Sequence, residues 1–164
     1  YMLSRTLNGL GYHTVRFNYR GVGKSVGQYG HGEGETDDLC AVMDYVFQET
    51  GETQCALAGF SFGSYVTANA ANRFHEKITQ LVNVAPAVDH MNFYGFDQVS
   101  CPWLVIQGDQ DDVAEPRATQ AWVSKVADSF VSIPHLVMMP GAGHFFHGRL
   151  LDLRHVLEME LASE

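Results

Sequence analysis

The sequence predicts an α/β fold in which a mostly parallel sheet is covered by helices on both faces. Segments with helical spacing of apolar residues alternate along the chain with short apolar segments of strand character. Most of these short segments are continuously apolar rather than alternating, which is typical of strands buried on both faces. Because neither an internal repeat nor a linker interrupts the pattern, we expect a single domain over residues 1–164.

The first part of the chain predicts a helix, a strand, a loop and a second helix. Residues 1–10 carry an apolar stripe at helical spacing, and residues 12–19 are rich in the aromatic and β-branched residues that favour strands. Residues 20–34 are rich in glycine and predict a loop. Thr36 is expected to cap the next helix, which should end just before Gly51.

The remainder of the chain continues the alternation of strands and helices. The expected strands are residues 53–58, 80–86, 103–107 and 136–139, and the expected helices are residues 64–74, 115–126 and 147–161. In an open α/β sheet, functional sites lie at the carboxyl ends of the strands. The loops that follow these strands are therefore the places to look for chemistry.

The composition excludes several classes of protein. A hydrophobic fraction of 46% and a charged fraction of 18% are ordinary for a globular chain of 164 residues and argue against disorder. A net charge of −9 disfavours nucleic acid as a partner. No apolar run approaches the roughly 18 residues of a membrane span. The cysteines Cys40, Cys55 and Cys101 are far apart in the chain, which favours a reducing cytoplasm over a disulfide framework or a zinc site.

The strongest motif is Gly59-Phe60-Ser61-Phe62-Gly63, a G-x-S-x-G pattern between an expected strand and an expected helix. A sharp strand-to-helix turn leaves no room for side chains at the two glycine positions and holds the serine with its hydroxyl exposed. The start of the following helix offers backbone N–H groups to a developing negative charge. The alternative is a glycine-rich turn with an incidental serine.

Two further loops follow expected strands and carry the partners that a serine nucleophile needs. Residues 107–113 contain three aspartates, and residues 140–144 end in His144. Each loop alone is more typical of a solvated surface. The order Ser61, aspartate, His144 is, however, the order in which the catalytic groups of α/β-hydrolases occur.

With these motifs the sequence resembles the α/β-hydrolase superfamily, and more narrowly the small, lidless bacterial hydrolases related to dienelactone hydrolase. The resemblance rests on residues 16–25, R-F-N-Y-R-G-V-G-K-S, on the G-x-S-x-G motif, and on residues 143–148, G-H-F-F-H-G. It implies that Ser61 attacks the substrate, that His144 takes its proton, and that an aspartate orients His144. It further implies that the N–H of Phe62 helps to bind the oxyanion, and that no metal or organic cofactor is needed.

The loop of residues 107–113 offers three candidates for the triad aspartate. In such families the acid commonly follows the strand-end glycine by three residues, which indicates Asp111, with Asp109 and Asp112 as competitors. Asp109 is better suited to forming the turn. His147 competes with His144 but is expected to open the last helix.

A second motif, Gly23-Lys24-Ser25, resembles the end of a phosphate-binding loop. The first glycine of such a loop would fall at Asn18, and the glycines that follow Ser25 disfavour the required helix. Nucleotide binding is therefore not favoured.

The length of the segment after the strand that ends near Pro86 bears on the substrate. Large caps are often inserted there, but residues 87–100 are too few for a cap domain. We therefore expect an open site for a small ester, thioester or lactone. The aromatic residues Phe60, Phe62, Phe145 and Phe146 either line an apolar pocket in this site or only pack around the serine turn. The alternatives are a peptidase or acyltransferase on the same triad and a non-catalytic binding module; a homodimer is also compatible with the sequence.

The strand order of the superfamily raises a question about the start of the chain. Residues 12–19 match its fourth strand, so the first three strands, roughly 30–40 residues, have no counterpart. The third strand normally separates the fourth from the fifth, here residues 53–58, so we expect a gap or a new register. The loop after the third strand also supplies a second oxyanion donor, whose loss typically lowers the rate about 10²–10³-fold. We therefore expect these 164 residues to be a part of a somewhat longer enzyme.

Overall fold

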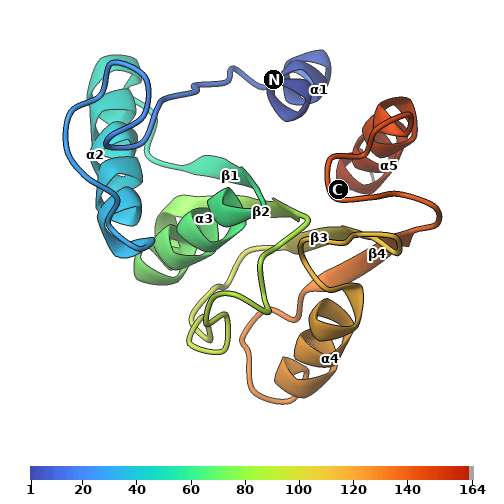
Figure 1. Ribbon diagram of the computed structural model, residues 1–164. Coiled ribbons are helices and arrows are strands. Elements are labelled where there is room, and N and C mark those ends of the chain that lie inside the picture. The colour runs from blue at the N-terminus through green and yellow to red at the C-terminus, as the bar shows by residue number, and fades with distance from the viewer. Residues whose placement is uncertain (163–164) are drawn as a thin grey trace.

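The computed structural model describes residues 1–162 and confirms the predicted alternation of helices and strands (Figure 1). The elements are α1 (Met2–Gly9), α2 (Glu33–Thr50), β1 (Cys55–Phe60), α3 (Phe62–Arg73), the short 3₁₀ helix η1 (His75–Lys77), β2 (Ile78–Val84), β3 (Trp103–Gly108), α4 (Pro116–Val126), β4 (His135–Met139) and α5 (Leu150–Leu161). Within the described residues, no helix has the length and apolar character needed to cross a membrane.

The four strands form one parallel sheet in the order β1-β2-β3-β4. Because all strands run the same way, their carboxyl ends meet at one edge, and the loops after β1, β3 and β4 open there. The three predicted catalytic groups lie in these three loops.

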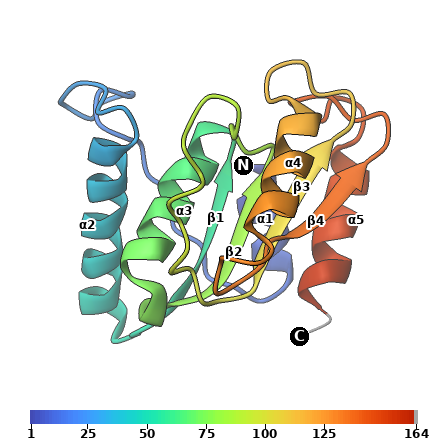
Figure 2. The same cartoon turned by 90° about the horizontal axis from the view of Figure 1, so that it is seen from below.

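The sheet carries a core on each face, which explains why its strands are continuously apolar. On β3, Trp103 and Val105 join the core formed with α2, α3 and α4, whereas Leu104 and Ile106 join the core formed with α5. Figure 2 shows α3 and α4 on the near face of the sheet. Successive strand residues point to opposite faces, so both sets must be apolar when both faces are covered. The predicted α/β fold with helices on both faces is confirmed.

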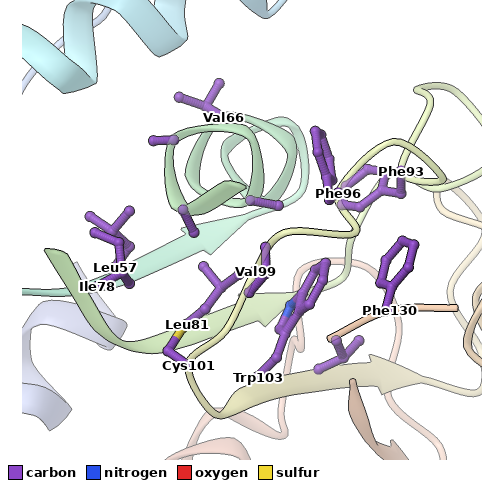
Figure 3. Close-up of a cluster of buried hydrophobic side chains, with 14 of the residues drawn as sticks. Leu57, Val66, Ile78, Leu81, Phe93, Phe96, Val99, Cys101, Trp103 and Phe130 are labelled. Carbon is purple, nitrogen blue, oxygen red and sulfur yellow. The ribbon is translucent and has the colours of Figure 1, made fainter. Parts of the chain in front are cut away.

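The larger core is built on aromatic rings (Figure 3). Trp122 is fully buried and meets Trp103, Phe93 and Phe130 edge-on, at centroid distances of 5.4, 5.5 and 6.5 Å. The indole N–H of Trp103 donates to the side-chain oxygen of Asn83 at 2.9 Å, so this buried donor is satisfied. Close packing of this kind fixes the strands, and through them the loops at their ends.

The prediction of a strand at residues 12–19 is wrong in this structure. The segment is extended and mostly exposed, but it forms no strand and does not pair with β1, which remains the edge of the sheet. A strand needs a neighbour to receive its backbone hydrogen bonds, and sequence character alone does not supply one. The absence of direct pairing between this segment and β1 agrees with the gap expected there.

The predicted start of α2 is also wrong, because the helix begins at Glu33 and Gly32, not Thr36, is its N-cap. The carboxylate of Glu35 accepts hydrogen bonds from the backbone N–H groups of Gly30 and Gly32, at 2.7 and 2.9 Å. This clamp starts the helix one turn earlier, and Thr36 donates to the Gly32 carbonyl from within it. Similarly, α5 begins at Leu150 rather than at residue 147.

Candidate active site

Ser61 lies on the sharp turn between β1 and α3 with a backbone conformation that non-glycine residues rarely adopt. Its φ is +52° and its ψ is −117°. A Cβ on Gly59 would overlap the carbonyl of Gly63, so the turn closes only with glycine at this position. The Ser61 N–H donates to the Val84 carbonyl of β2 at 2.9 Å, which anchors the turn to the sheet. Strain of this kind, on the order of 1–3 kcal/mol, persists only where the surroundings hold it.

The structure brings Ser61, His144 and Asp111 together from three separate loops. The Nε2 atom of His144 lies 3.1 Å from the Ser61 hydroxyl oxygen, and its Nδ1 atom lies 2.9 Å from a carboxylate oxygen of Asp111. His144 is 4% exposed and the Asp111 side chain is fully buried. When Nδ1 carries the proton donated to the carboxylate, Nε2 is free to accept from the serine hydroxyl.

The carboxylate of Asp111 is held by donors that surround it. The backbone N–H groups of Val113 and Ala114 donate to it at 2.9 and 2.8 Å, and the amide of Gln107 donates at 2.9 Å. These contacts fix the carboxylate with both oxygens facing the imidazole. Sequence analysis did not identify Gln107; the available signal was a polar residue at the end of an otherwise apolar strand.

The competing residues take other positions. Asp109 accepts from the Gly141 N–H at 2.7 Å and so ties the aspartate loop to the histidine loop, as suits a turn residue. Asp112 and His147 are exposed. Of the three aspartates in this loop, Asp111 is the one hydrogen-bonded to His144.

The loops after β3 and β4 are in direct backbone contact and leave no room for a side chain at Gly108. A Cβ on Gly108 would overlap the carbonyl of Ala142, and that carbonyl accepts a hydrogen bond from Gln110 at 3.0 Å. The distance between Asp111 and His144 is therefore set by direct backbone contact rather than by flexible side chains.

Phe62 is the first residue of α3, directly after the serine. The first N–H groups of a helix have no partner within the helix, and they carry the positive end of its dipole. The Phe62 N–H therefore provides a donor beside Ser61, where negative charge develops when a carbonyl is attacked.

The Phe62 side chain borders a pocket of about 270 Å³. Its lining consists of Tyr19, Arg20, Gly21, Val22, Tyr29, Glu35 and Phe62. The rings of Tyr19 and Tyr29 lie 5.8 and 5.7 Å from the Phe62 ring. The pocket wall is thus largely aromatic on the side next to the serine turn.

Three charged residues stabilise this wall. Burial disfavours the charged form of Glu35, but its hydrogen bonds from Gly30 and Gly32, with Arg20 nearby, hold the pKa of Glu35 below its ordinary value. Arg20 forms a two-pronged ion pair with Asp38 at 3.0 and 2.8 Å, and this hydrogen bonding lowers the pKa of Asp38. Both contacts connect the loop that lines the pocket to α2.

The aromatic residues expected to line a pocket separate into two groups. Phe146 is 1% exposed and belongs to the core beneath α5, so it serves packing. Phe60, Phe62 and Phe145 are accessible next to the serine turn or the histidine loop. Among residues 1–162, no group of three or more histidine, cysteine, aspartate or glutamate side chains is placed to hold a metal ion.

Comparison with known proteins shows the family of the chain. Residues 2–95 match the family described as serine aminopeptidase, S33. An alpha-beta serine hydrolase homologue from Coxiella burnetii is 44% identical, with a TM-score of 0.88 over 98% of this chain and 74% of that one. The protein XC6422 from Xanthomonas campestris, an α/β serine hydrolase without a lid, is 40% identical, with a TM-score of 0.90 over 99% of this chain and 71% of that one.

A further relative is the lysophosphatidylserine lipase ABHD12 of Macaca fascicularis, which is 28% identical over 68% of this chain and 37% of the lipase. A relative from Rickettsia prowazekii is 31% identical over 83% of this chain. The chain spans 59% of the length of that relative and 37% of the length of the lipase. The match to the family covers more than half of the chain, and the fold agrees with that of lidless bacterial hydrolases. The chain therefore belongs to the serine aminopeptidase S33 family of serine hydrolases with the α/β-hydrolase fold.

Proposed function

We propose that this protein hydrolyses small carboxylic esters, thioesters or lactones through an acyl-enzyme on Ser61. The observation that carries the proposal is the continuous chain of contacts from Asp111 through His144 to the Ser61 hydroxyl. Aspartate, histidine and serine in this sequence of hydrogen bonds form the arrangement that activates a serine for acyl transfer.

In the first step the Ser61 oxygen forms a bond to the substrate carbonyl carbon while its proton passes to Nε2 of His144. The carbonyl oxygen takes the negative charge and accepts a hydrogen bond from the Phe62 N–H. The bond from the carbonyl carbon to the leaving oxygen then breaks, and His144 gives its proton to that oxygen. Water repeats the sequence on the acyl-enzyme, with His144 as base and then acid, and releases the carboxylic acid.

The proposed preference for small substrates is supported by the segment between β2 and β3. Its apolar side chains Phe93, Phe96 and Val99 are 0%, 5% and 1% exposed and belong to the core beside α3 and α4. A segment that uses its apolar residues in the core is not built to cover the serine. The similarity to a hydrolase without a lid supports the same conclusion.

An aminopeptidase activity is the second candidate, because the matching family carries that description. The same triad acts on amides when a pocket holds a charged amino terminus. The pocket beside Phe62 contains the carboxylate of Glu35, but this carboxylate is already occupied by two backbone N–H groups and lies near Arg20. We therefore favour the esterase.

The test is a panel of short acyl p-nitrophenyl esters and aminoacyl p-nitroanilides, assayed with the parent chain and with Ser61→Ala. We expect ester hydrolysis by the parent, a loss of several orders of magnitude in Ser61→Ala, and full activity in Ser129→Ala, an exposed serine in the loop that follows α4. Hydrolysis of anilides but not of esters would replace the esterase by the peptidase. Equal ester hydrolysis by the parent and Ser61→Ala would overturn the nucleophile.

A further inference from the structure

An aromatic cluster surrounds His144 and shares no residue with the lining of the Phe62 pocket. The ring of Phe60 is 5.1 Å from the His144 ring and 6.0 Å from the Phe145 ring, and the rings of His144 and Phe145 are 4.9 Å apart, edge to face. His144 is buried, whereas Phe145 is 58% exposed. A large apolar side chain thus stands open to solvent against the imidazole that reacts.

The direction of proton transfer fixes which part of the substrate meets this cluster. His144 delivers its proton from Nε2 to the leaving oxygen, so this oxygen must come within about 3 Å of Nε2. Whatever is bonded to the leaving oxygen then lies beside the rings that contact the imidazole. The acyl substituent is a separate group on the same tetrahedral carbon, so it points in a different direction from the leaving oxygen.

We propose that Phe145, together with Phe60, forms a leaving-group subsite that favours esters of apolar, especially aromatic, alcohols. The inference rests on the proposed esterase function and makes it more specific. Contact between two aromatic rings adds to the free energy gained by burying their surface. The added contribution of the ring contact corresponds to a preference of about tenfold for an aromatic over a small aliphatic alcohol. The ring of Phe145 gains that burial when an alcohol side chain covers it.

Phe145 is suited to a test because it is exposed and its loss opens no cavity in either core. The experiment measures kcat/KM for benzyl acetate and for methyl acetate. Benzyl alcohol carries an aromatic ring and methanol does not, but the two alcohols are similarly good leaving groups. Both esters give the same acetyl-enzyme, so a difference between them reports on the leaving group. The variants are Phe145→Ala and Phe145→Leu, and the matched control is Phe74→Ala, a half-exposed phenylalanine at the far end of α3.

We expect the ratio of kcat/KM for benzyl acetate over methyl acetate to fall about tenfold in Phe145→Ala and by a smaller factor in Phe145→Leu. The ratio should not change in Phe74→Ala, and the rate of acetyl-enzyme hydrolysis should be the same in all variants because the alcohol has already left. An unchanged ratio in Phe145→Ala, with both esters hydrolysed, would overturn the subsite but leave the esterase standing. Failure of the parent chain to hydrolyse either ester would instead overturn the proposed function.

Discussion

The loops at the carboxyl edge of the sheet and the segment of residues 12–19 are held in opposite ways. In the loops, backbone groups bond to neighbouring strands: the Ser61 N–H donates to Val84, and the Asp109 N–H donates to Met139. Residues 12–19 have strand-like composition but pair with no strand. The segment is fixed instead largely by side chains: the Thr14 hydroxyl contacts Ser4 at 2.7 Å, and Phe17 and Tyr19 pack against the larger core.

The difference teaches where the precision of the site comes from. Pairing with parallel neighbours fixes the register of each strand and therefore where it ends, and the loops that follow then meet through backbone contacts. A segment without such neighbours takes a path whose position depends on a few side-chain contacts. Four predictions test this contrast, and they are given from the largest expected effect to the smallest.

The largest effect is expected for Asp111→Asn. An asparagine can accept from the Val113 and Ala114 N–H groups through its oxygen, but its NH₂ then faces Nδ1 of His144. The imidazole must carry its proton on Nε2 and can no longer accept from Ser61. We expect kcat/KM for a short ester to fall about 10⁴-fold, as in serine proteases with the same change. The matched control is Asp112→Asn, an exposed position at which activity should stay within about twofold of the parent.

A steric change at the serine turn should have the largest effect on stability. Gly59→Ala places a methyl group against the Gly63 carbonyl, and we expect the free energy of unfolding to fall by about 3 kcal/mol. Gly9→Ala in α1 adds the same methyl group where nothing lies within 4 Å, so stability should rise by about 0.5–1 kcal/mol. Denaturant unfolding measures both. Equal stability of the two variants would show that the turn is not closely packed.

A pair of valine substitutions compares a paired strand with the unpaired segment. Val105 on β3 is fully buried, and Val105→Ala should lower the free energy of unfolding by about 2 kcal/mol. Val15 is 60% exposed, and Val15→Ala should change it by less than about 0.5 kcal/mol. A loss of similar size at Val15 would mean that the Val15 side chain is packed against a neighbour.

The smallest effect concerns the clamp that joins the pocket loop to α2. Because the native pKa of Glu35 lies below its ordinary value of 4.5, its charge stabilises the fold above pH 4.5, and this stabilisation is lost as the pH falls through the native pKa. We expect Glu35→Gln to lower the free energy of unfolding by about 1 kcal/mol at neutral pH. The difference from the parent should shrink in acid. A difference that is constant with pH would contradict the role of the charge.

The sequence predicted the fold class and the meeting of Ser61, Asp111 and His144 because each of these residues follows an apolar strand in a parallel sheet. It could not predict the contacts made by Gln107 or Glu35, because they depend on how the neighbouring loops fold back: the Gln107 amide meets the Asp111 carboxylate, and the Glu35 carboxylate meets the N–H of Gly30. The strand at residues 12–19 was predicted from composition, and composition does not provide a partner. The cap at Thr36 failed for a similar reason, because Glu35 competes for the same helix start.

The central claim is that Ser61 is the nucleophile that His144 and Asp111 activate. The most direct measurement is to react the folded chain with a fluorophosphonate, which phosphonylates activated serines, and to locate the adduct by digestion and tandem mass spectrometry. The account predicts one adduct on the peptide that contains Ser61, greatly reduced in Asp111→Asn and absent in Ser61→Ala. An adduct on a different residue, or none on a chain shown to be folded, would contradict it.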